Sequence, residues 1–321
     1  MTLVRNRCRK VLILGTLPPP VGGVSIHVKR LVELLEKHNI VFSFLSLKSS
    51  FCFIFFRIFT HQIIHLHCSN VYFRCLLAFF CFLLRKKLWI TYHGNLGRYN
   101  RWKNSLDYLS VYFVDIPIVL NEHSFWLARK WNGKVKWISS FLPPQQEEQL
   151  SMTLLGQLHE LRSTYKLLCS TNVSAVAFDD RQQEIYGIVA LLDLFETRKS
   201  DCLLVSDSSG NYKDYILTIR KKIPKNVVFI AENHSYYALL KEVDCMIRNT
   251  LTDGDALSVK EALFLKKYVC ATDVVSRHYA VNTYHTLQEL GELLDKYRET
   301  EYLLEHLSAE QELLNLYQNI G

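Results

Sequence analysis

Three carboxylates gather within nine residues late in the sequence, in the stretch DGDALSVKEAL at residues 253–263. Asp253 and Asp255 flank a glycine, and Glu261 follows where an apolar helical pattern begins. Carboxylates are strong hydrogen-bond acceptors and can hold the hydroxyl groups of a sugar or a ribose. A plainer interpretation stays open, because Ser258 and Glu261 have the spacing of a capping box, whose side chains only stabilise a helix N-terminus.

Two earlier places also carry residues suited to a ligand. Gly22 and Gly23 precede a helical pattern, where free backbone N–H groups can bind an oxyanion, although the pair can equally form a plain loop with positive φ angles. His93 follows the strand-like residues 89–92 and precedes a glycine, which suits hydrogen bonding or proton transfer, although a single histidine is more often structural. The pattern G-x-G-x-x-G is missing from this turn, so nothing supports a nicotinamide cofactor.

The run His65-Leu66-His67-Cys68 looks like a metal site until strand geometry is considered. Residues 65 and 67 share one face of a strand while Cys68 points to the other, and no third ligand follows at a usable spacing. We therefore expect no bound metal and no cofactor. The nine cysteines are scattered and odd in number, which together with the lack of a recognisable signal peptide favours reduced thiols and a cytoplasmic location.

Strand patterns alternate with helical patterns along the chain, which predicts an α/β fold with doubly wound parallel sheets. In the first half the expected strands are 11–14, 63–66, 88–92, 116–120 and 135–139, and the expected helices are 24–35 and 76–84. In the second half the expected strands are 167–169, 175–178, 202–206, 227–230, 245–247 and 269–271, the expected helices are 184–195, 212–222, 236–242 and 257–264, and a helical tail spans 287–317. The proline pair at 143–144 gives the boundary, and we expect a Rossmann-like domain at 1–143, a linker at 144–163, a second Rossmann-like domain at 164–285 and C-terminal helices at 286–321.

The charge of the chain is uneven. Residues 1–148 hold 20 Lys and Arg against 7 Asp and Glu, a net +13, whereas the remainder is −6. The aromatic-rich, basic half suits an anionic partner, either a membrane surface or a phosphorylated ligand, and no nucleic-acid recognition motif accompanies it. The apolar runs Phe51–Phe59 and Leu76–Leu84 are each about half as long as a bilayer-spanning helix, so they are either helices of the α/β layer or segments that touch a membrane interface.

Taken in order, three of these motifs resemble the family four glycosyltransferases. They are PPPVGG at 18–23, His93-Gly94, and Asp253 followed after seven residues by Glu261-Ala262 and then by VCATD at 269–273. The resemblance covers residues 11 to about 275. It implies the GT-B fold, in which two Rossmann-like domains face each other across a cleft, and a retaining transfer of a sugar from a nucleotide-sugar donor without a metal ion.

The resemblance also implies roles for individual residues. Glu261 would hold the donor ribose, Asp253 the transferred sugar with help from Asp255, and His93 would lie near the reacting sugar. Gly22 and Gly23 would face the donor phosphates and the acceptor, and the residues beside the sugar and the diphosphate would be Ala256, Leu257 and Ser258.

Two departures from the family pattern matter. The first acid is Asp253 where the family has a glutamate. The family also places an arginine and a lysine after the first strand of the second domain, where they neutralise the departing diphosphate. Here Arg181 can serve as the arginine, but the lysine position is acidic.

The resemblance implies a bacterial enzyme of surface-polysaccharide synthesis, such as O-antigen, lipopolysaccharide, capsule or exopolysaccharide, with a saccharide acceptor on a lipid carrier. Such an enzyme would work at the cytoplasmic membrane face, with peripheral contact through its basic half. A transferase with a soluble acceptor is the second choice. The alternative from another class is a catalytically inactive relative that binds a nucleotide sugar or a partner subunit, which the missing lysine favours.

Overall fold

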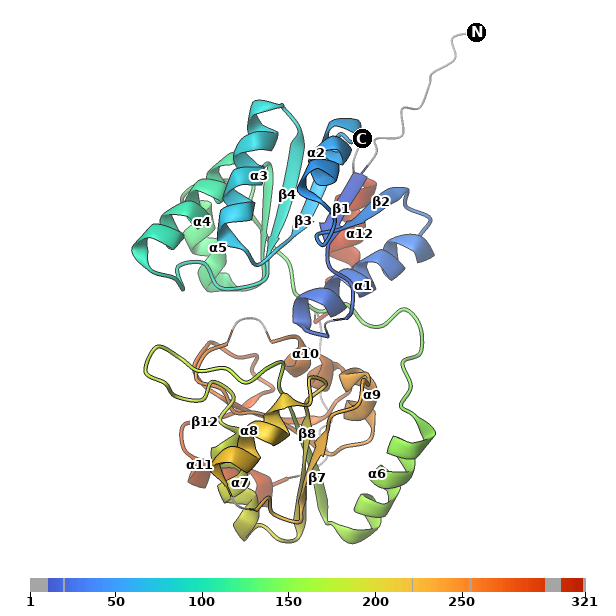
Figure 1. Ribbon diagram of the computed structural model, residues 1–321, viewed down its shortest axis with the longest axis vertical. Coiled ribbons are helices and arrows are strands. Elements are labelled where there is room, and N and C mark those ends of the chain that lie inside the picture. The colour runs from blue at the N-terminus through green and yellow to red at the C-terminus, as the bar shows by residue number, and fades with distance from the viewer. Residues whose placement is uncertain (1–10, 20, 221, 254–255, 298–306, 320–321) are drawn as a thin grey trace. The chain divides into compact units, whose positions relative to one another are not determined.

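The computed structural model describes residues 11–19, 21–220, 222–253, 256–297 and 307–319, which form two compact units. The first unit holds the chain up to Gln145 and again from Ser308, and the second holds Gln146–Leu307. Asp255 lies outside the described residues. Each unit is built on a six-stranded sheet in which all strand pairs are parallel. Figure 1 shows helices packed beside the strands in both units.

The first sheet has the strand order β2-β1-β3-β4-β5-β6. Its strands are β1 Val11–Gly15, β2 Phe42–Ser46, β3 Ile63–His67, β4 Lys87–Tyr92, β5 Ile116–Val119 and β6 Lys136–Trp137. Its helices are α1 Gly23–Lys37, α2 Phe51–Thr60, α3 Val71–Leu83, α4 Arg101–Phe113, α5 Glu122–Arg129 and α12 Glu310–Gln318. Because the chain leaves β1 to opposite sides for β2 and β3, the order reverses there, and a parallel sheet opens a crevice at such a point.

Side chains alternate between the two faces of the first sheet, and each face packs into its own hydrophobic core. Leu12, Leu14, Ile64 and Leu66 pack with the layer formed by α2, α3, α4 and α5. Ile13, Ile63 and Trp89 on the other face pack with α1 and with leucines of α12. Helices α3, α4 and α5 begin where the side chain of a preceding asparagine accepts a hydrogen bond from a first-turn N–H, which satisfies a donor that the helix itself cannot.

The second sheet has the order β12-β11-β10-β7-β8-β9, so its reversal lies between β7 and β10. Its strands are β7 Leu167–Asn172, β8 Asp201–Ser206, β9 Val227–Ile230, β10 Cys245–Arg248, β11 Tyr268–Thr272 and β12 Asn282–Tyr284. Its helices are α6 Met152–Thr164, α7 Ile188–Thr197, α8 Asn211–Ile219, α9 Tyr236–Lys241, α10 Leu257–Phe264 and α11 Leu287–Asp295. One face packs with α7, α8 and α11, and the other carries α6, α9 and α10.

The predicted fold class is confirmed, with differences in detail. Residues 175–178 form no strand, and only Phe178 bridges to Glu184. Two strands were missed, β2 and β12. Most of α6 falls in the stretch expected to be a linker, and the expected helical tail separates into α11 in the second unit and α12 in the first.

The two apolar runs form α2 and part of α3, and each helix is apolar on two sides. Ile54, Ile58 and Leu77 enter the core, whereas Phe56 and Phe82 are more than half exposed. Core packing therefore accounts for only one side of each run. Among the described residues, every helix is too short or too polar to cross a membrane.

Candidate functional site

Three histidines converge at the carboxyl edge of the first sheet. His67 ends β3, His93 directly follows β4, and His27 reaches the same place from α1. One ring nitrogen of each lies within 4.8 Å of the others, and the ring centroids are 5.1–5.4 Å apart. Gly15 ends the neighbouring β1, where a Cβ atom would come within 3.0 Å of Val28, so this position keeps α1 close to the sheet.

Hydrogen bonds orient these rings. The Ser140 carbonyl accepts from Nδ1 of His27 at 2.8 Å, which leaves Nε2 of that ring as the basic nitrogen. Nδ1 of His67 lies 3.1 Å from Nε2 of His93. Nε2 of His67 is buried and has no hydrogen-bond partner among the described residues.

Two members of the group, His67 and His93, are held neutral. Burial, followed by the charge of His65, lowers the pKa of His67 well below its ordinary value, and burial, followed by the charge of His27, does the same for His93. His65 lies behind the cluster, between Tyr317 and Thr91, and burial lowers its pKa to about 3. At neutral pH His67 and His93 therefore offer uncharged imidazoles, which can accept a proton, bind a hydroxyl group or coordinate a metal ion.

The histidine cluster removes the reason for excluding a metal site, which was the lack of a third ligand at a usable spacing along the chain. His65 and His67 do share one strand face, as expected, with ring centroids 4.2 Å apart. The additional candidate ligands are His27 of α1 and His93 after β4. Their closeness to His67 cannot be seen from the spacing of residues along the chain. Three imidazoles are a ligand set that zinc accepts, so the expectation of a metal-free protein needs a direct test.

Gly22 and Gly23 lie at the start of α1 in the first unit. Gly22 is the N-cap residue with an extended φ of −171°, and Gly23 is the first helical residue. Neither glycine has a positive φ, so the plain-loop interpretation is wrong. A Cβ atom at either position would meet nothing within 4 Å.

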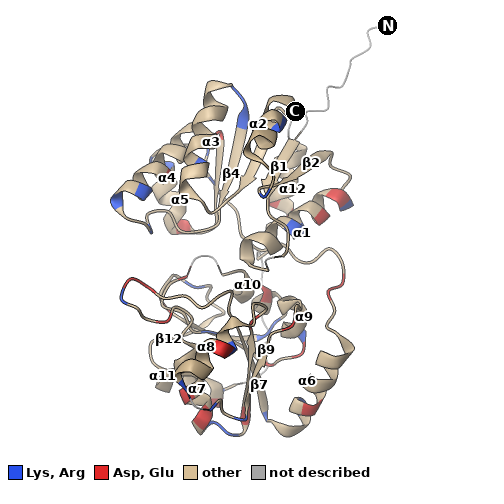
Figure 2. Ribbon diagram, in the orientation of Figure 1, with Lys and Arg blue, Asp and Glu red and all other residues tan. Residues whose placement is uncertain are grey.

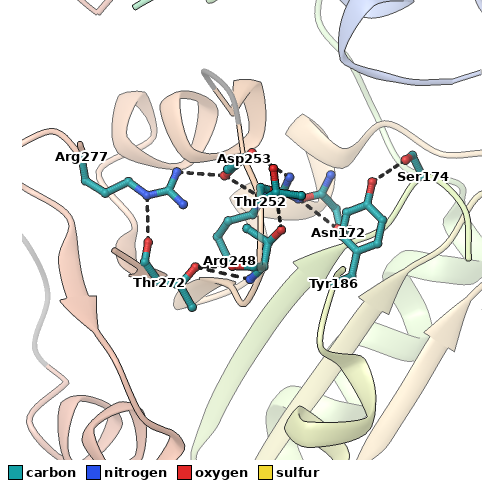
Figure 3. A network of polar contacts seen from close by, with 9 residues as sticks. Asn172, Ser174, Tyr186, Arg248, Thr252, Asp253, Thr272 and Arg277 are labelled. Atoms are coloured by element: carbon teal, nitrogen blue, oxygen red, sulfur yellow. Dashed lines mark hydrogen bonds and ion pairs between the residues drawn. The ribbon is translucent and has the colours of Figure 1, made fainter. Parts of the chain in front are cut away.

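In the second unit, Asp253 joins two arginines into a buried network (Figure 3). Arg248 ends β10 and donates to Asp253 from Nη2 at 3.1 Å and from Nε at 3.2 Å. Arg277 donates to the same carboxylate from Nη1 at 2.9 Å and to the Thr272 carbonyl at 3.1 Å. Nη1 of Arg248 also donates to the carbonyl of Asn172 at the end of β7, so the network spans the point where the strand order reverses.

This network carries an excess positive charge in a buried place. The side chains of Arg277 and Asp253 are each 5% exposed, and that of Arg248 is 13% exposed. Burial alone would raise the pKa of Asp253, but the charge and hydrogen bonds of Arg248, followed by those of Arg277, hold it below its ordinary value. Among the residues shown in Figure 3, two cations share one anion, and Nη2 of Arg277 has no hydrogen-bond partner among the described residues. This arrangement can accept an anion.

The carboxylates of the stretch at residues 253–263 lie in different environments. Helix α10 has Ala256 as its N-cap residue with no side-chain cap, so Ser258 lies inside the helix and the capping-box interpretation is wrong. Leu257 is the first helical residue. Glu261 is 4% exposed on the buried side of α10, and its charge contributes, after burial, to the raised pKa of Tyr236.

Arg181 and Glu184 lie in the loop between β7 and α7. Arg181 is exposed, and its backbone N–H donates to Asp179. The Glu184 carboxylate accepts from the N–H groups of Ile188 and Val189 at 2.9 and 3.1 Å and from the Tyr212 hydroxyl. The acid in this loop therefore caps the N-terminus of α7, which favours a negative charge.

Sequence reasoning missed His27, Arg248 and Arg277. His27 had a usable indication, because it stands four and seven residues before Leu31 and Leu34 on the buried stripe of α1. Arg248 also had one, since it ends an otherwise apolar strand. Arg277 had none, because its place beside Asp253 depends on the loop after β11.

Comparisons with known proteins support the fold. No protein-family model and no curated protein matches the chain. Among solved structures, Anabaena HepE in complex with UDP has 13% sequence identity and a TM-score of 0.66, over 97% of this chain and 98% of that one.

Two further structures are similar over the whole chain. UDP-GlcNAc 2-epimerase from Methanocaldococcus jannaschii has 11% identity and a TM-score of 0.63, with 96% and 99% of the two chains covered. WaaG, a glycosyltransferase involved in lipopolysaccharide biosynthesis, has 10% identity and a TM-score of 0.64, with 96% and 100% covered. The two-sheet α/β architecture is therefore that of GT-B proteins, as the sequence resemblance implied.

Proposed function

We propose that this protein is a glycosyltransferase that moves a sugar from a nucleotide-sugar donor to a saccharide acceptor. The observation that carries the proposal is the buried Arg248–Asp253–Arg277 network at the reversal point of the second sheet, where α/β proteins bind their ligands. The fold shared with HepE, which has been solved with UDP and with UDP-glucose, supports a nucleotide-sugar donor.

In this proposal Arg248 and Arg277 bind the donor diphosphate. Guanidinium groups match phosphate oxygens in charge and geometry, and Nη2 of Arg277 has a hydrogen still to donate. Asp253 then positions the two arginines, a different role from the direct contact with the sugar that the resemblance implies. The pair supplies the charge that the missing lysine would have given to the departing diphosphate.

The remaining roles follow the resemblance. Glu261 binds the ribose hydroxyls, the N-terminus of α10 at Ala256–Ser258 lies beside the diphosphate, and Gly22 and Gly23 border the donor. His93, held neutral chiefly by burial, hydrogen-bonds the reacting sugar. We propose family four membership, retention of configuration at the anomeric carbon, and transfer without a metal ion.

For the acceptor we propose a lipid-linked saccharide of surface-polysaccharide synthesis, reached at the cytoplasmic face of the membrane. The net charge of +13 in residues 1–148 supports an acceptor that carries phosphate beside an anionic surface. A soluble acceptor is the second choice, and transfer assays with both kinds of acceptor distinguish them.

Donor binding is tested by the thermal stability of the purified protein with UDP-, GDP-, ADP- and CMP-sugars, without added metal. A ligand at about 100 times its dissociation constant stabilises the folded state by about 2.7 kcal/mol. We expect one nucleotide series to stabilise the wild type but not Arg277→Gln or Glu261→Gln. The exposed Lys199→Gln in the same unit is the matched control and should respond like the wild type.

Catalysis is tested by transfer assays with the donor identified in this way, and NMR of the product gives its anomeric configuration. Donor binding without transfer to any acceptor tested would favour the inactive relative. A folded protein that no nucleotide stabilises would contradict the proposed function.

A further inference from the structure

The outward side of α2, α3 and α4 in the first unit is unusually aromatic. We call it the aromatic face and define it by Phe56, Phe59, Phe79, Phe82, Leu83 and Tyr112. Each of these side chains is at least 45% exposed, and Phe56 reaches 61%. Apolar side chains that gather in one exposed place mark an interaction surface, whereas scattered ones need no explanation.

Ring contacts join this face across three helices. Phe80 of α3 packs against Phe59 of α2 with centroids 5.9 Å apart. Phe113 of α4 packs against Phe79 and Phe82 at 5.4 and 5.0 Å. The aromatic face is therefore one continuous surface, because the exposed rings rest on partly buried ones.

A groove of about 470 Å³ between α3 and α4 adjoins this face at Phe79. Its walls are apolar and include Tyr72, Leu76, Phe79, Leu106, Leu109 and Phe113. A groove of this composition can take an apolar chain.

The charged residues around the face are mostly basic, although Asp115, just after α4, is acidic and accepts a hydrogen bond from the Leu88 N–H. Within α2, α3 and α4 the one acidic residue is Asp107, which is buried and paired with Arg74. Basic residues stand at the helix ends: Arg57 in α2, Arg85 and Lys87 after α3, and Arg101 in the first turn of α4 (Figure 2). Lys86 links the helices by donating to the Phe59 and His61 carbonyls at 2.8 Å.

We propose that the aromatic face docks on the surface of a bilayer that contains anionic lipids, with the α3–α4 groove taking one lipid chain. Aromatic rings prefer the interfacial layer of a membrane, and lysine and arginine bind its anionic headgroups. A protein partner fits less well, because protein interfaces usually have a polar rim of mixed charge and this rim is mostly basic. The inference deepens the proposed function and rests on it only for the identity of the acceptor.

The test is flotation of the full chain with vesicles, without donor or acceptor. The wild type should bind to and float with vesicles of equal parts phosphatidylcholine and phosphatidylglycerol, and it should bind less to vesicles of pure phosphatidylcholine. The variant Phe56→Ser/Phe79→Ser/Phe82→Ser should lower binding about tenfold or more. Arg85→Gln/Lys87→Gln should lower binding to the anionic vesicles alone.

The matched control is Leu217→Ser/Ile219→Ser on α8 of the second unit, where two apolar side chains are about equally exposed. It should bind like the wild type, and all variants should keep the wild-type circular dichroism spectrum and nucleotide response. A folded wild type that ignores anionic vesicles overturns the inference, as does a triple variant that binds normally. Concentration-dependent dimerisation that the triple variant abolishes, without vesicle binding, assigns the face to a second copy and also overturns it. None of these three results bears on donor binding, which the nucleotide panel measures separately.

Discussion

At the scale of single residues, the main feature of this protein is a carboxylate held between two buried arginines. Asp253 accepts from Arg248 and Arg277, and all three side chains are largely removed from water. Removing one partner from a buried ion pair leaves the other charges uncompensated, which costs far more than losing a pair at the surface.

We therefore predict that Asp253→Asn lowers the free energy of unfolding by about 3 kcal/mol, measured by urea denaturation. Asp193→Asn is the control, because Asp193 is 63% exposed in its pair with Arg220 and should cost less than about 1 kcal/mol. Equal effects of the two substitutions would show that the buried network contributes no more than a surface pair.

The histidine cluster gives a prediction about pH. The folded protein keeps His65 neutral, with a pKa of about 3, whereas the unfolded chain protonates it below about pH 6.5. Protons then favour the unfolded chain, so stability falls as pH falls from about 6.5 toward 3, by about 1.4 kcal/mol per pH unit for this residue. His67 and His93 act in the same direction, while the lowered pKa of Asp253 matters only below its ordinary value of 3.8.

We expect His65→Gln to flatten this dependence, measured as the free energy of unfolding between pH 6.5 and about 4.5. The exposed His123→Gln on α5 should leave the slope unchanged. A wild-type stability that does not vary over this range would contradict the burial of neutral imidazoles.

The same cluster gives a prediction about metals. Because the proposed transfer needs no metal ion, EDTA should leave its rate unchanged, and the purified protein should contain less than one equivalent of zinc by elemental analysis. A loss of activity that zinc restores, and that His67→Gln abolishes, would instead assign His27, His67 and His93 as a metal site.

At the scale of elements, α12 determines how the first unit completes its core. Leu313 and Tyr317 of this helix are buried against the sheet with Trp89, and the Tyr317 hydroxyl bonds Nδ1 of His65. The last described helix is thus structural for a unit whose other residues end at Gln145.

We predict that Leu313→Ala destabilises the first unit by about 3 kcal/mol, because it leaves a cavity in this core. Gln311→Ala, on the exposed side of the same helix, should change stability by less than about 0.5 kcal/mol. Comparable effects at both positions in thermal unfolding would mean that α12 does not stay packed in solution.

Much of the fold was predictable from local pattern. Buried parallel strands appear as short apolar runs in the sequence, so β1, β3 and β4 lie within one residue of their expected bounds. Strands β2 and β12 were missed because they are edge strands with partly exposed side chains. Residues 175–178 carry a strand pattern but lie in the loop before α7, where pairing is limited to one bridge.

The candidate site was predictable only in part. Residues at strand ends, such as His93, could be chosen because parallel sheets gather ligands there. Their partners could not, because the contact of His93 with His27 depends on how α1 crosses the sheet. In the same way, the pairing of Asp253 with Arg277 depends on a loop that follows a different strand.

At the scale of the whole molecule, the two units have separate cores and separate proposed tasks. We predict that a bound nucleotide slows hydrogen exchange in the second unit, at residues 172–187 and 248–261, while anionic vesicles slow it in α2, α3 and α4. Mass spectrometry of peptides measures both effects. Nucleotide protection confined to the first unit would contradict the assignment of the donor site.

The position of α12 also bears on how the protein is made. The first unit begins with β1 but needs α12 for its core, and residues 146–307 of the second unit are synthesised in between. At about 5–20 residues per second, the ribosome takes roughly 8 to 30 s to cross that interval. The second unit can therefore fold first on the ribosome. The first unit, although synthesised earlier, keeps the apolar sheet face that α12 covers exposed until that helix is made, and chaperones would have to cover it.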